Sequence, residues 1–500
     1  MADHSVNADA RASGETPDPR RWAALAVLLV GAFLAPLDFF IVNVAMPAMA
    51  AGLKASAAQM QLVISGYAVV YAVLLITGGR LGDIFGRKSI FMIGLAGFAL
   101  ASAVCGLAWS ASSLIAGRLL QALAAAAMAP QAIASLHALF PAHERGRALS
   151  IYGVTIGFSS IAGQLLGGAL VAANVGGFGW RLIFLINLPI AIGAFVAAIP
   201  LLGDTRGTSR PRLDFGGVIL SAAALTALVL PLIEGRELGW PWWTIVMLVS
   251  TPFFLEAFRR YEIRLARRGG DPLVAMDIFK SPGVLRGLCA LLTLYALASF
   301  FLTFSIYLQA GLGRGAFAAG VAILPLSVGF LIGSTFSPAL GAFAGRAAPS
   351  VGFLLSAAGL VALSTLVAWA PAGQSPPFMA LAPALSIIGL GMGMSVPTLF
   401  RVIVERVDPK RAGLVGGLTN SSLQVSAAIG VALLGGLFFA VLRGRTDPAS
   451  IAYAFSLTLL GVAACHLLGA ALGAGLGQPR RAKTNATIAA PPRPVLEAAE

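Results

Sequence analysis

Charged side chains are scarce in this sequence of 500 residues. They make up 11% of the chain, whereas hydrophobic residues make up 58%. Soluble domains carry about 25% charged residues, because a folded protein in water needs polar groups to cover its surface. The composition therefore argues against a water-soluble globular fold and fits a protein whose solvent is lipid.

Cysteine and the motifs of several enzyme classes are also scarce. The three cysteines (Cys105, Cys289 and Cys465) lie in apolar runs, without CxxC spacing or a neighbouring His or acid set, so neither disulfides nor a metal site is expected. The spacing in Gly82–Ser89 does not fit a phosphate-binding loop. No nucleophile and base stand in a recognisable pattern, so we expect neither an enzyme nor a bound cofactor.

Basic residues exceed acidic ones, which gives a net charge of +14, but they lie in short segments between apolar runs. If the N-terminus is cytoplasmic, the inner segments hold 26 Lys and Arg and the outer segments hold 6. This bias follows the positive-inside rule, with both termini in the cytoplasm. The charge excess thus indicates membrane topology, and no nucleic-acid partner is expected.

Fourteen apolar runs are long enough to cross a bilayer, which takes about 20 helical residues. An even number of spans agrees with two termini on one side. The predicted runs begin near residues 22, 60, 89, 111, 147, 181, 214, 240, 283, 315, 350, 377, 412 and 451.

A weak internal repeat divides these runs. The segment Gly79–Arg87 has an echo at Gly341–Arg346, and Pro141–Ala148 has one at Asp408–Gly413. Two similar halves of six helices around a central cavity are one standard plan of membrane transporters. The predicted divisions are a cytoplasmic tail (1–21), a six-helix bundle (22–202), an inserted helix pair with a linker (203–282), a second six-helix bundle (283–475) and a disordered tail (476–500).

Two charged residues stand deep inside apolar runs. Asp38 lies about 24 Å along the first run and Arg118 about 10 Å into the fourth, at a similar depth. An ionisable group there costs about 2.5 kcal/mol or more, so each needs a cavity or a partner. Asp38 either carries a proton, because burial favours the protonated carboxyl, or forms a fixed ion pair that locks two helices. Arg118 either tunes its proton affinity or extends to the outer surface.

Two further patterns concern a tight turn and helix packing, and a third concerns substrate binding. The segment after the second run combines glycines that allow a tight turn with charges that can cap a helix and anchor at headgroups. The fifth run carries glycines on one face, which permit a close helix crossing or a hinge. Polar and aromatic residues in other runs are candidates for a cavity lining. The residues of the segment after the second run are Gly79, Gly82, Asp83, Gly86, Arg87 and Lys88; the glycines of the fifth run are Gly153, Gly157, Gly163, Gly167 and Gly168. The cavity candidates are Tyr67, Gln121, Gln131, Phe304, Tyr307, Asn420 and Gln424, within a wider set that includes Tyr71, Tyr295, Phe301 and Gln309.

Together these motifs resemble the major facilitator superfamily, and specifically its fourteen-span drug:proton antiporters, over residues 22–475. Asp38–Pro47 is similar to the first-helix motif, with Phe40 in place of a frequent Thr. Gly79–Lys88 is similar to the superfamily's gating signature, so we call these residues the gating segment. Arg118 with Gln121 is similar to the fourth-helix motif, with Ala122 where Gly is usual. Gly163–Gly168 is similar to the antiporter motif, with Gln164 in place of Pro. The segments Trp180–Pro189 and Tyr307–Gln309 also match the fourteen-span pattern.

The resemblance implies the major facilitator fold, an all-α polytopic protein of the cell membrane. It implies export of small amphipathic, possibly cationic compounds in exchange for protons, with Asp38 and Arg118 in proton coupling and Gly79–Lys88 as a cytoplasmic latch. A proton gradient would take the place of a cofactor, and we expect a monomer. One deep acid favours monovalent or neutral substrates over dications. The alternatives are a transporter specific for an endogenous metabolite and, far behind, a membrane enzyme or receptor.

Overall fold

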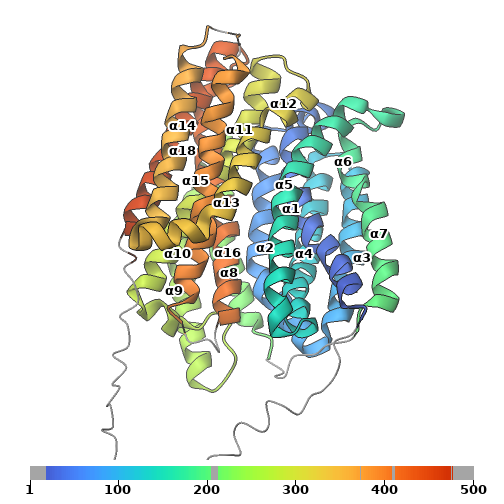
Figure 1. Cartoon of the computed structure of the whole chain (residues 1–500). Helices are drawn as coiled ribbons and strands as arrows, with labels where there is room; N and C mark the ends of the chain where they lie inside the picture. The colour runs from blue at the N-terminus through green and yellow to red at the C-terminus, as the bar shows by residue number, and fades with distance from the viewer. Residues whose placement is uncertain are drawn as a thin grey trace, which may run out of the picture.

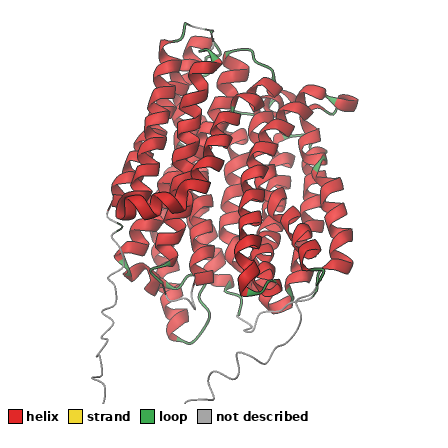
Figure 2. Cartoon of the chain, viewed as in Figure 1, coloured by secondary structure: helices red, strands yellow, loops and turns green. Residues whose placement is uncertain are grey.

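The computed structural model describes residues 19–203, 212–371, 373–374, 376–407, 412–474 and 476. This part of the chain is helical with short connections and contains no strand, so the predicted all-α class is confirmed (Figures 1 and 2). Nearly all of the predicted tails (1–21 and 476–500), and most of the Asp408–Gly413 echo, lie outside the described residues.

The helices begin within a few residues of the predicted apolar runs. Several spans consist of two helices joined by a 3-10 or π turn. The bounds are α1 (Arg21–Leu53), α2 (Ala57–Phe85), α3 (Arg87–Gly106), α4 (Ala111–Leu139), α5 (Ala142–Ala173), α6 (Leu182–Leu185), α7 (Asn187–Leu201), α8 (Phe215–Glu237), α9 (Trp242–Arg267), α10 (Pro282–Leu294), α11 (Ala298–Ile306), α12 (Ala316–Ala322), α13 (Leu324–Ala344), α14 (Ala348–Trp369), α15 (Phe378–Val404), α16 (Ala412–Gly430), α17 (Gly436–Leu442) and α18 (Pro448–Ala474).

Among the described residues, 13 helical stretches are long and apolar enough to cross a membrane. The run predicted near residue 240 becomes α9, which packs along α8 but is not one of the 13. Its first half is apolar, whereas its second half carries charges from Glu256 to Arg267. Fourteen spans and the cytoplasmic termini therefore remain predictions.

Local sequence signals place several helix ends. Ser56 begins α2 with a reciprocal cap: its hydroxyl accepts from the Gln59 backbone N–H at 3.2 Å, and the Gln59 side chain accepts from the Ser56 N–H at 2.9 Å. Gly86 separates α2 from α3 at a φ of 99°, a conformation that side chains with a Cβ rarely adopt. The glycine of the gating segment is thus needed for the turn itself.

The helices form two packed halves, α1–α7 and α10–α18; α8 packs against α2, and α9 packs against α8 (Figure 1). We call the end of the bundle that carries residues 80–88, 141–147, 212–214 and 259–282 the basic end, which the charge bias assigns to the cytoplasm. At the opposite end the halves touch directly. There the Gln309 side chain of the second half donates to the Val44 carbonyl of α1 at 2.8 Å. Farther along, α12 packs against α5.

Candidate functional site

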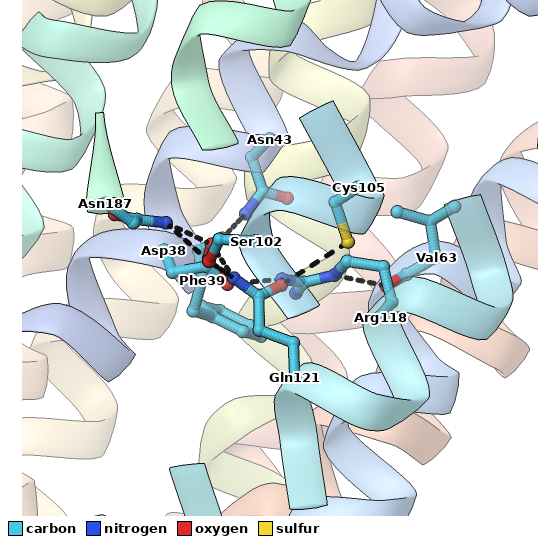
Figure 3. Close-up of polar contacts among 9 residues, drawn as sticks. All are labelled: Asp38, Phe39, Asn43, Val63, Ser102, Cys105, Arg118, Gln121 and Asn187. Carbon is cyan, nitrogen blue, oxygen red and sulfur yellow. Dashed lines mark hydrogen bonds and ion pairs between the residues drawn. The ribbon is translucent and has the colours of Figure 1, made fainter. Parts of the chain in front are cut away.

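Asp38 and Arg118 form a fully buried ion pair within the first half of the molecule (Figure 3). A carboxylate oxygen of Asp38, on α1, accepts from Nη1 of Arg118, on α4. Their side chains are 0% and 1% exposed, so Arg118 does not extend to the outer surface. The two deep charges of the sequence are therefore direct partners that join two helices.

Three uncharged polar residues complete the surroundings of Asp38. The second carboxylate oxygen accepts from the Gln121 amide at 2.8 Å and from the Asn187 amide at 3.1 Å. Both amides also reach the Ser102 hydroxyl, at 2.9 and 3.4 Å. The carboxylate thus touches groups from α4 and α7 and reaches Ser102 of α3 through the two amides, so a change in its charge acts on four helices.

Arg118 has partners besides Asp38. Its Nε donates to the Val63 carbonyl at 3.2 Å, its Nη1 donates to Gln121 at 2.6 Å, and its guanidinium lies 4.1 Å from the ring centre of Tyr67. A cation over an aromatic face gains about 2 kcal/mol when desolvated. The arginine therefore keeps partial compensation on α2 if the charge of Asp38 is removed.

The gating segment packs against α4. Arg87 forms an ion pair at 3.1 Å with Asp83, which lies four residues earlier in the same segment. It also donates to the Ala134 carbonyl of α4 at 2.9 Å. A Cβ at Gly82 would clash with the Gln131 side chain, whereas one at Gly79 would have ordinary space. Lys88 donates to the Ile199 carbonyl at 2.7 Å. In this conformation the segment joins helices of the first half.

The glycine face of α5 meets two helices. A Cβ at Gly163 would lie 2.8 Å from the Leu37 carbonyl, and one at Gly167 would lie 2.9 Å from the Ile41 carbonyl, both on α1. A Cβ at Gly168 would lie 2.6 Å from the Ala316 carbonyl on α12. The small residues therefore let α5 touch the first helix and the second half of the molecule together.

A cavity of about 60 Å³ lies between the two halves. It is too small for a drug-sized molecule, so the halves must separate to admit one. The polar residues of its lining carry no charge. The lining is Phe39, Phe40, Ile156, Ser160, Gln164, Tyr295, Leu297, Ala298, Phe301, Leu326, Ser327, Phe330 and Met392.

The sequence predicts seven cavity candidates within a wider set. None of the seven lines this cavity, whereas Tyr295 and Phe301 of the wider set do. Tyr67 and Gln121 belong to the Arg118 surroundings. Gln131 is buried and donates to the Gly78 carbonyl at 2.7 Å.

The remaining four candidates lie in the second half of the molecule. Phe304 and Tyr307 pack on Phe455 inside it: the Phe304 ring is tilted with its centre 5.8 Å from that of Phe455, and the Tyr307 ring is stacked at 4.9 Å. Asn420 and Gln424 are half-buried on α16, which packs against α2. The polarity of a residue does not determine the helix face on which it lies, so polarity alone could not identify the cavity lining.

Sequence reasoning assigned no role to Ser102 or Asn187, which contact Asp38 and its partners. A polar amide within an apolar run was the available signal for Asn187. Sequence reasoning also missed a pair of buried acids at the basic end, Asp214 before α8 and Glu262 on α9, which are 4% and 0% exposed.

These two acids hold the segment that connects α9 to the second half. Asp214 accepts from the Leu273 N–H at 2.9 Å, and Glu262 accepts from the Val274 N–H at 3.0 Å. Arg80 of the gating segment donates to the carbonyls of Asp271, at 2.9 Å, and of Pro272 in the same connection. The inserted helix pair is thus attached to the gating segment through one short stretch of backbone.

The two carboxyl groups lie close enough to share a proton, since a Cβ at Gly217 would clash with Oε1 of Glu262 and with Oδ2 of Asp214 alike. Burial raises the pKa of Glu262 from 4.5 to about 8, and the neighbouring Asp214 adds to this effect. Burial alone would also raise the pKa of Asp214, but hydrogen bonds from Gly217, Glu262, Leu273 and Tyr261 lower it below its ordinary value. Glu262 is therefore the protonated member at neutral pH, with Arg80 the nearby cation.

We expect the docking of residues 271–274 to weaken as pH rises from about 4.5 to about 8. In that window the docked state keeps a proton that an exposed Glu gives up, so rising pH opposes docking. Glu262→Gln keeps the acceptor for Val274 and a donor for Asp214 but has no proton to lose. Hydrogen exchange of the Leu273 and Val274 amides, corrected for intrinsic rates, should speed up with pH in the parent and stay flat in the variant.

Glu405→Gln, at an exposed ion pair with Arg401, is the matched control and should behave as the parent. Equal pH dependence in the parent and in Glu262→Gln would contradict the shared proton.

Comparison with known proteins identifies relatives along most of the chain. The family model described as "Major Facilitator Superfamily" matches residues 28–431. A protein named "Probable actinorhodin transporter" from Streptomyces coelicolor is 36% identical over 89% of this chain and 76% of its own length. A tetracenomycin C resistance and export protein from Streptomyces glaucescens is 35% identical over 83% and 76%. A puromycin resistance protein from Streptomyces alboniger is 37% identical over 85% and 83%.

Solved structures share the fold at low sequence identity. A bacterial homologue of the human lysosomal transporter Spinster, in an inward-facing and unoccupied conformation, has a TM-score of 0.67 at 18% identity. The match covers 92% of this chain and 98% of that one. A D-xylose–proton symporter has a TM-score of 0.60 at 13% identity, over 89% of this chain and 97% of that one. These structures support the arrangement of helices described above.

Proposed function

This chain belongs to the major facilitator superfamily, and we propose that it exports small amphipathic compounds from the cell in exchange for protons. The family and the apolar helices make it a multi-pass protein of the cell membrane, a transporter and not an enzyme. Three relatives carry names of antibiotic transport or resistance, which favours drug efflux over transport of a nutrient.

One observation carries the proton-coupling part of the proposal. Asp38 is buried in a charge pair, and the next two residues on α1, Phe39 and Phe40, line the cavity between the halves. The Phe40 side chain contacts the Phe301 ring of the second half with ring centres 5.2 Å apart. A change at Asp38 therefore acts on the same helical turn that forms the wall of the cavity.

The geometry suggests how a proton could drive the exchange. While Asp38 is ionised, its bond to Arg118 holds α1 and α4 together. A proton on Asp38 removes the charge attraction and leaves Arg118 with the Tyr67 ring and the Val63 carbonyl. The helices α1, α4 and α7 can then shift. Exchange results if an occupied cavity and a protonated Asp38 favour opposite arrangements of these helices.

The gating segment supplies the second element of the proposed cycle. We place Gly79–Lys88 as a latch that holds the outward-open state. In the conformation seen here Asp83 bonds Arg87 within the segment, and the halves are joined at the end opposite to it. This arrangement fits a closed outer end, with Asp83 and Arg87 bonding groups of the first half while Arg80 bonds the connection after α9.

Inverted vesicles from expressing cells test the proposed direction of transport. With an acidic interior, proton exchange should drive a fluorescent amphipathic dye into the vesicles, and a protonophore should collapse the uptake, because the gradient is the energy source. Vesicles without the protein set the background. Uptake that needs ATP would contradict the proposal, as would dye movement only toward the alkaline side. Transport restricted to one endogenous metabolite would favour the substrate-specific alternative.

A further inference from the structure

The cavity between the halves has a specific chemical character. Five of its lining residues are aromatic: Phe39, Phe40, Tyr295, Phe301 and Phe330. They come from both halves, since Phe39 and Phe40 lie on α1 and the others lie between residues 295 and 330. Offset or edge-on aromatic contacts contribute about 0.5–1.5 kcal/mol beyond the area they bury. Such walls favour a flat aromatic ligand.

No charged side chain belongs to this lining. Asp38, the nearest acid along α1, is 0% exposed and bonded to Arg118, Gln121 and Asn187. A charged ligand in the cavity would lose its hydration without gaining a counter-ion, which is costly in an apolar site. The described lining thus selects against anions, and a cation would meet aromatic faces without a counter-ion to offset its lost hydration.

Gln164 gives the cavity its one amide side chain; the other polar groups of the lining are the hydroxyls of Ser160, Tyr295 and Ser327. Gln164 lies on α5, is 2% exposed, and its amide nitrogen has no hydrogen-bond partner among the described residues. A buried donor left unpaired costs about 1–3 kcal/mol. A ligand that brings an oxygen acceptor to this amide removes that cost, and a ligand without one does not.

Two departures from the motifs of the family meet in this cavity. Phe40 stands where Thr is frequent and Gln164 stands where Pro is usual, and both line the same space. The first adds an aromatic surface, and the second adds an amide. Ala122, a third departure, is buried elsewhere in the first half.

We infer that this cavity, once the halves separate enough to admit a ligand, binds neutral, planar aromatic compounds, and that the Gln164 amide recognises a carbonyl oxygen on them. The inference rests on the proposed function, because it treats this cavity as the site of the exported compound. It narrows the substrate class from amphipathic compounds, possibly cationic, to uncharged aromatic ketones and related carbonyl compounds.

A matched pair of probes tests the inference by equilibrium binding. Fluorenone and fluorene are neutral and planar and differ by one carbonyl oxygen. Equilibrium dialysis against the full chain in lipid nanodiscs, with empty nanodiscs to subtract partition into lipid, gives both affinities. We expect the parent to bind fluorenone about tenfold more tightly than fluorene, which corresponds to about 1.4 kcal/mol. Ethidium, a planar cation, should bind more weakly than fluorenone.

Two variants assign the preference to residues. Gln164→Met keeps the size of the side chain without the amide and should remove the difference between fluorenone and fluorene by weakening fluorenone alone. Phe40→Thr should weaken both probes equally, because it removes aromatic surface and no hydrogen bond. If Gln164→Met does not fold, the comparison of fluorenone with fluorene on the parent still tests whether the cavity prefers a carbonyl compound.

Three results would overturn the inference: equal affinities of the parent for fluorenone and fluorene, a preference that survives Gln164→Met, or ethidium as the tightest ligand. Because dialysis uses no proton gradient, these results leave the vesicle test of export untouched. Conversely, a carbonyl preference that depends on Gln164 would stand even if no gradient drove transport.

Discussion

Asp38→Asn should abolish accumulation driven by a pH gradient while leaving the substrate able to bind and exchange. A gradient of one pH unit supplies about 1.4 kcal/mol per proton, enough for about tenfold accumulation of a neutral substrate exchanged for one proton. Asparagine has nearly the shape of aspartate and can still accept from Gln121 and Asn187, but it cannot take up a proton. Proteoliposomes should therefore show about tenfold accumulation with the parent and none with the variant.

Two control measurements show whether the loss of accumulation is specific to proton coupling at Asp38. Exchange of labelled for unlabelled substrate at equal concentrations needs no gradient, so Asp38→Asn should retain it. Glu256→Gln makes the same chemical change at an exposed acid paired with Arg259 and Arg260 and should leave accumulation unchanged. Full gradient-driven accumulation in Asp38→Asn would show that the ion pair is a fixed lock between helices.

Arg118→Met should be the most destabilising single change in the network. It leaves the carboxylate of Asp38 buried without its counter-ion, and removing one partner of a buried pair costs about 3–5 kcal/mol. Unfolding in detergent at pH 8 should show this loss. Arg314→Met, at an exposed arginine near the opposite end of the bundle, is the control and should cost little.

The double variant Asp38→Asn with Arg118→Met should recover much of that stability, because no buried charge remains. The interaction between the two sites is then read from a double-mutant cycle. If the double variant is as unstable as the two single losses added together, the pair does not act as a unit, and the coupling role of Arg118 fails with it.

The sequence predicts the helical class from its apolar runs. It also predicts that Asp38 and Arg118 are partners, because the two residues lie at a similar depth in the membrane. Hydropathy along a helix fixes how far each residue lies from the membrane surface, since each residue rises about 1.5 Å. Asp38 and Arg118 came out at similar depths, and isolated charges in lipid need partners. The structure joins them directly.

Depth does not fix the direction in which a side chain points around the helix axis. Phe301 lines the cavity, whereas Phe304, in the same helix and less than a turn away, packs on Phe455. The packing between helices determines which of these two side chains faces the cavity. Asn187 was overlooked for a related reason, because an amide is a weak signal in an apolar run until its neighbours are known.

The acid pair at the basic end escaped detection because its members are distant in sequence. Glu262 stands among many charges in a segment that looks solvated, yet α9 turns it toward Asp214 and away from solvent. The apolar half of α9 predicted a membrane span, but the charged half keeps this helix outside the set of 13. Helix–helix contacts buried Glu262, whereas the composition of α9 alone left it outside that set.

Proton movement caused by substrate, with no imposed pH gradient, tests the exchange most directly. Proteoliposomes hold a trapped pH-sensitive dye at equal internal and external pH, with the membrane potential clamped at zero, and a neutral substrate is added outside. The account predicts that substrate entry drives protons out, so the interior becomes alkaline with the parent and not with Asp38→Asn. Substrate entry that leaves the internal pH unchanged, or makes it acidic, would contradict proton exchange through Asp38.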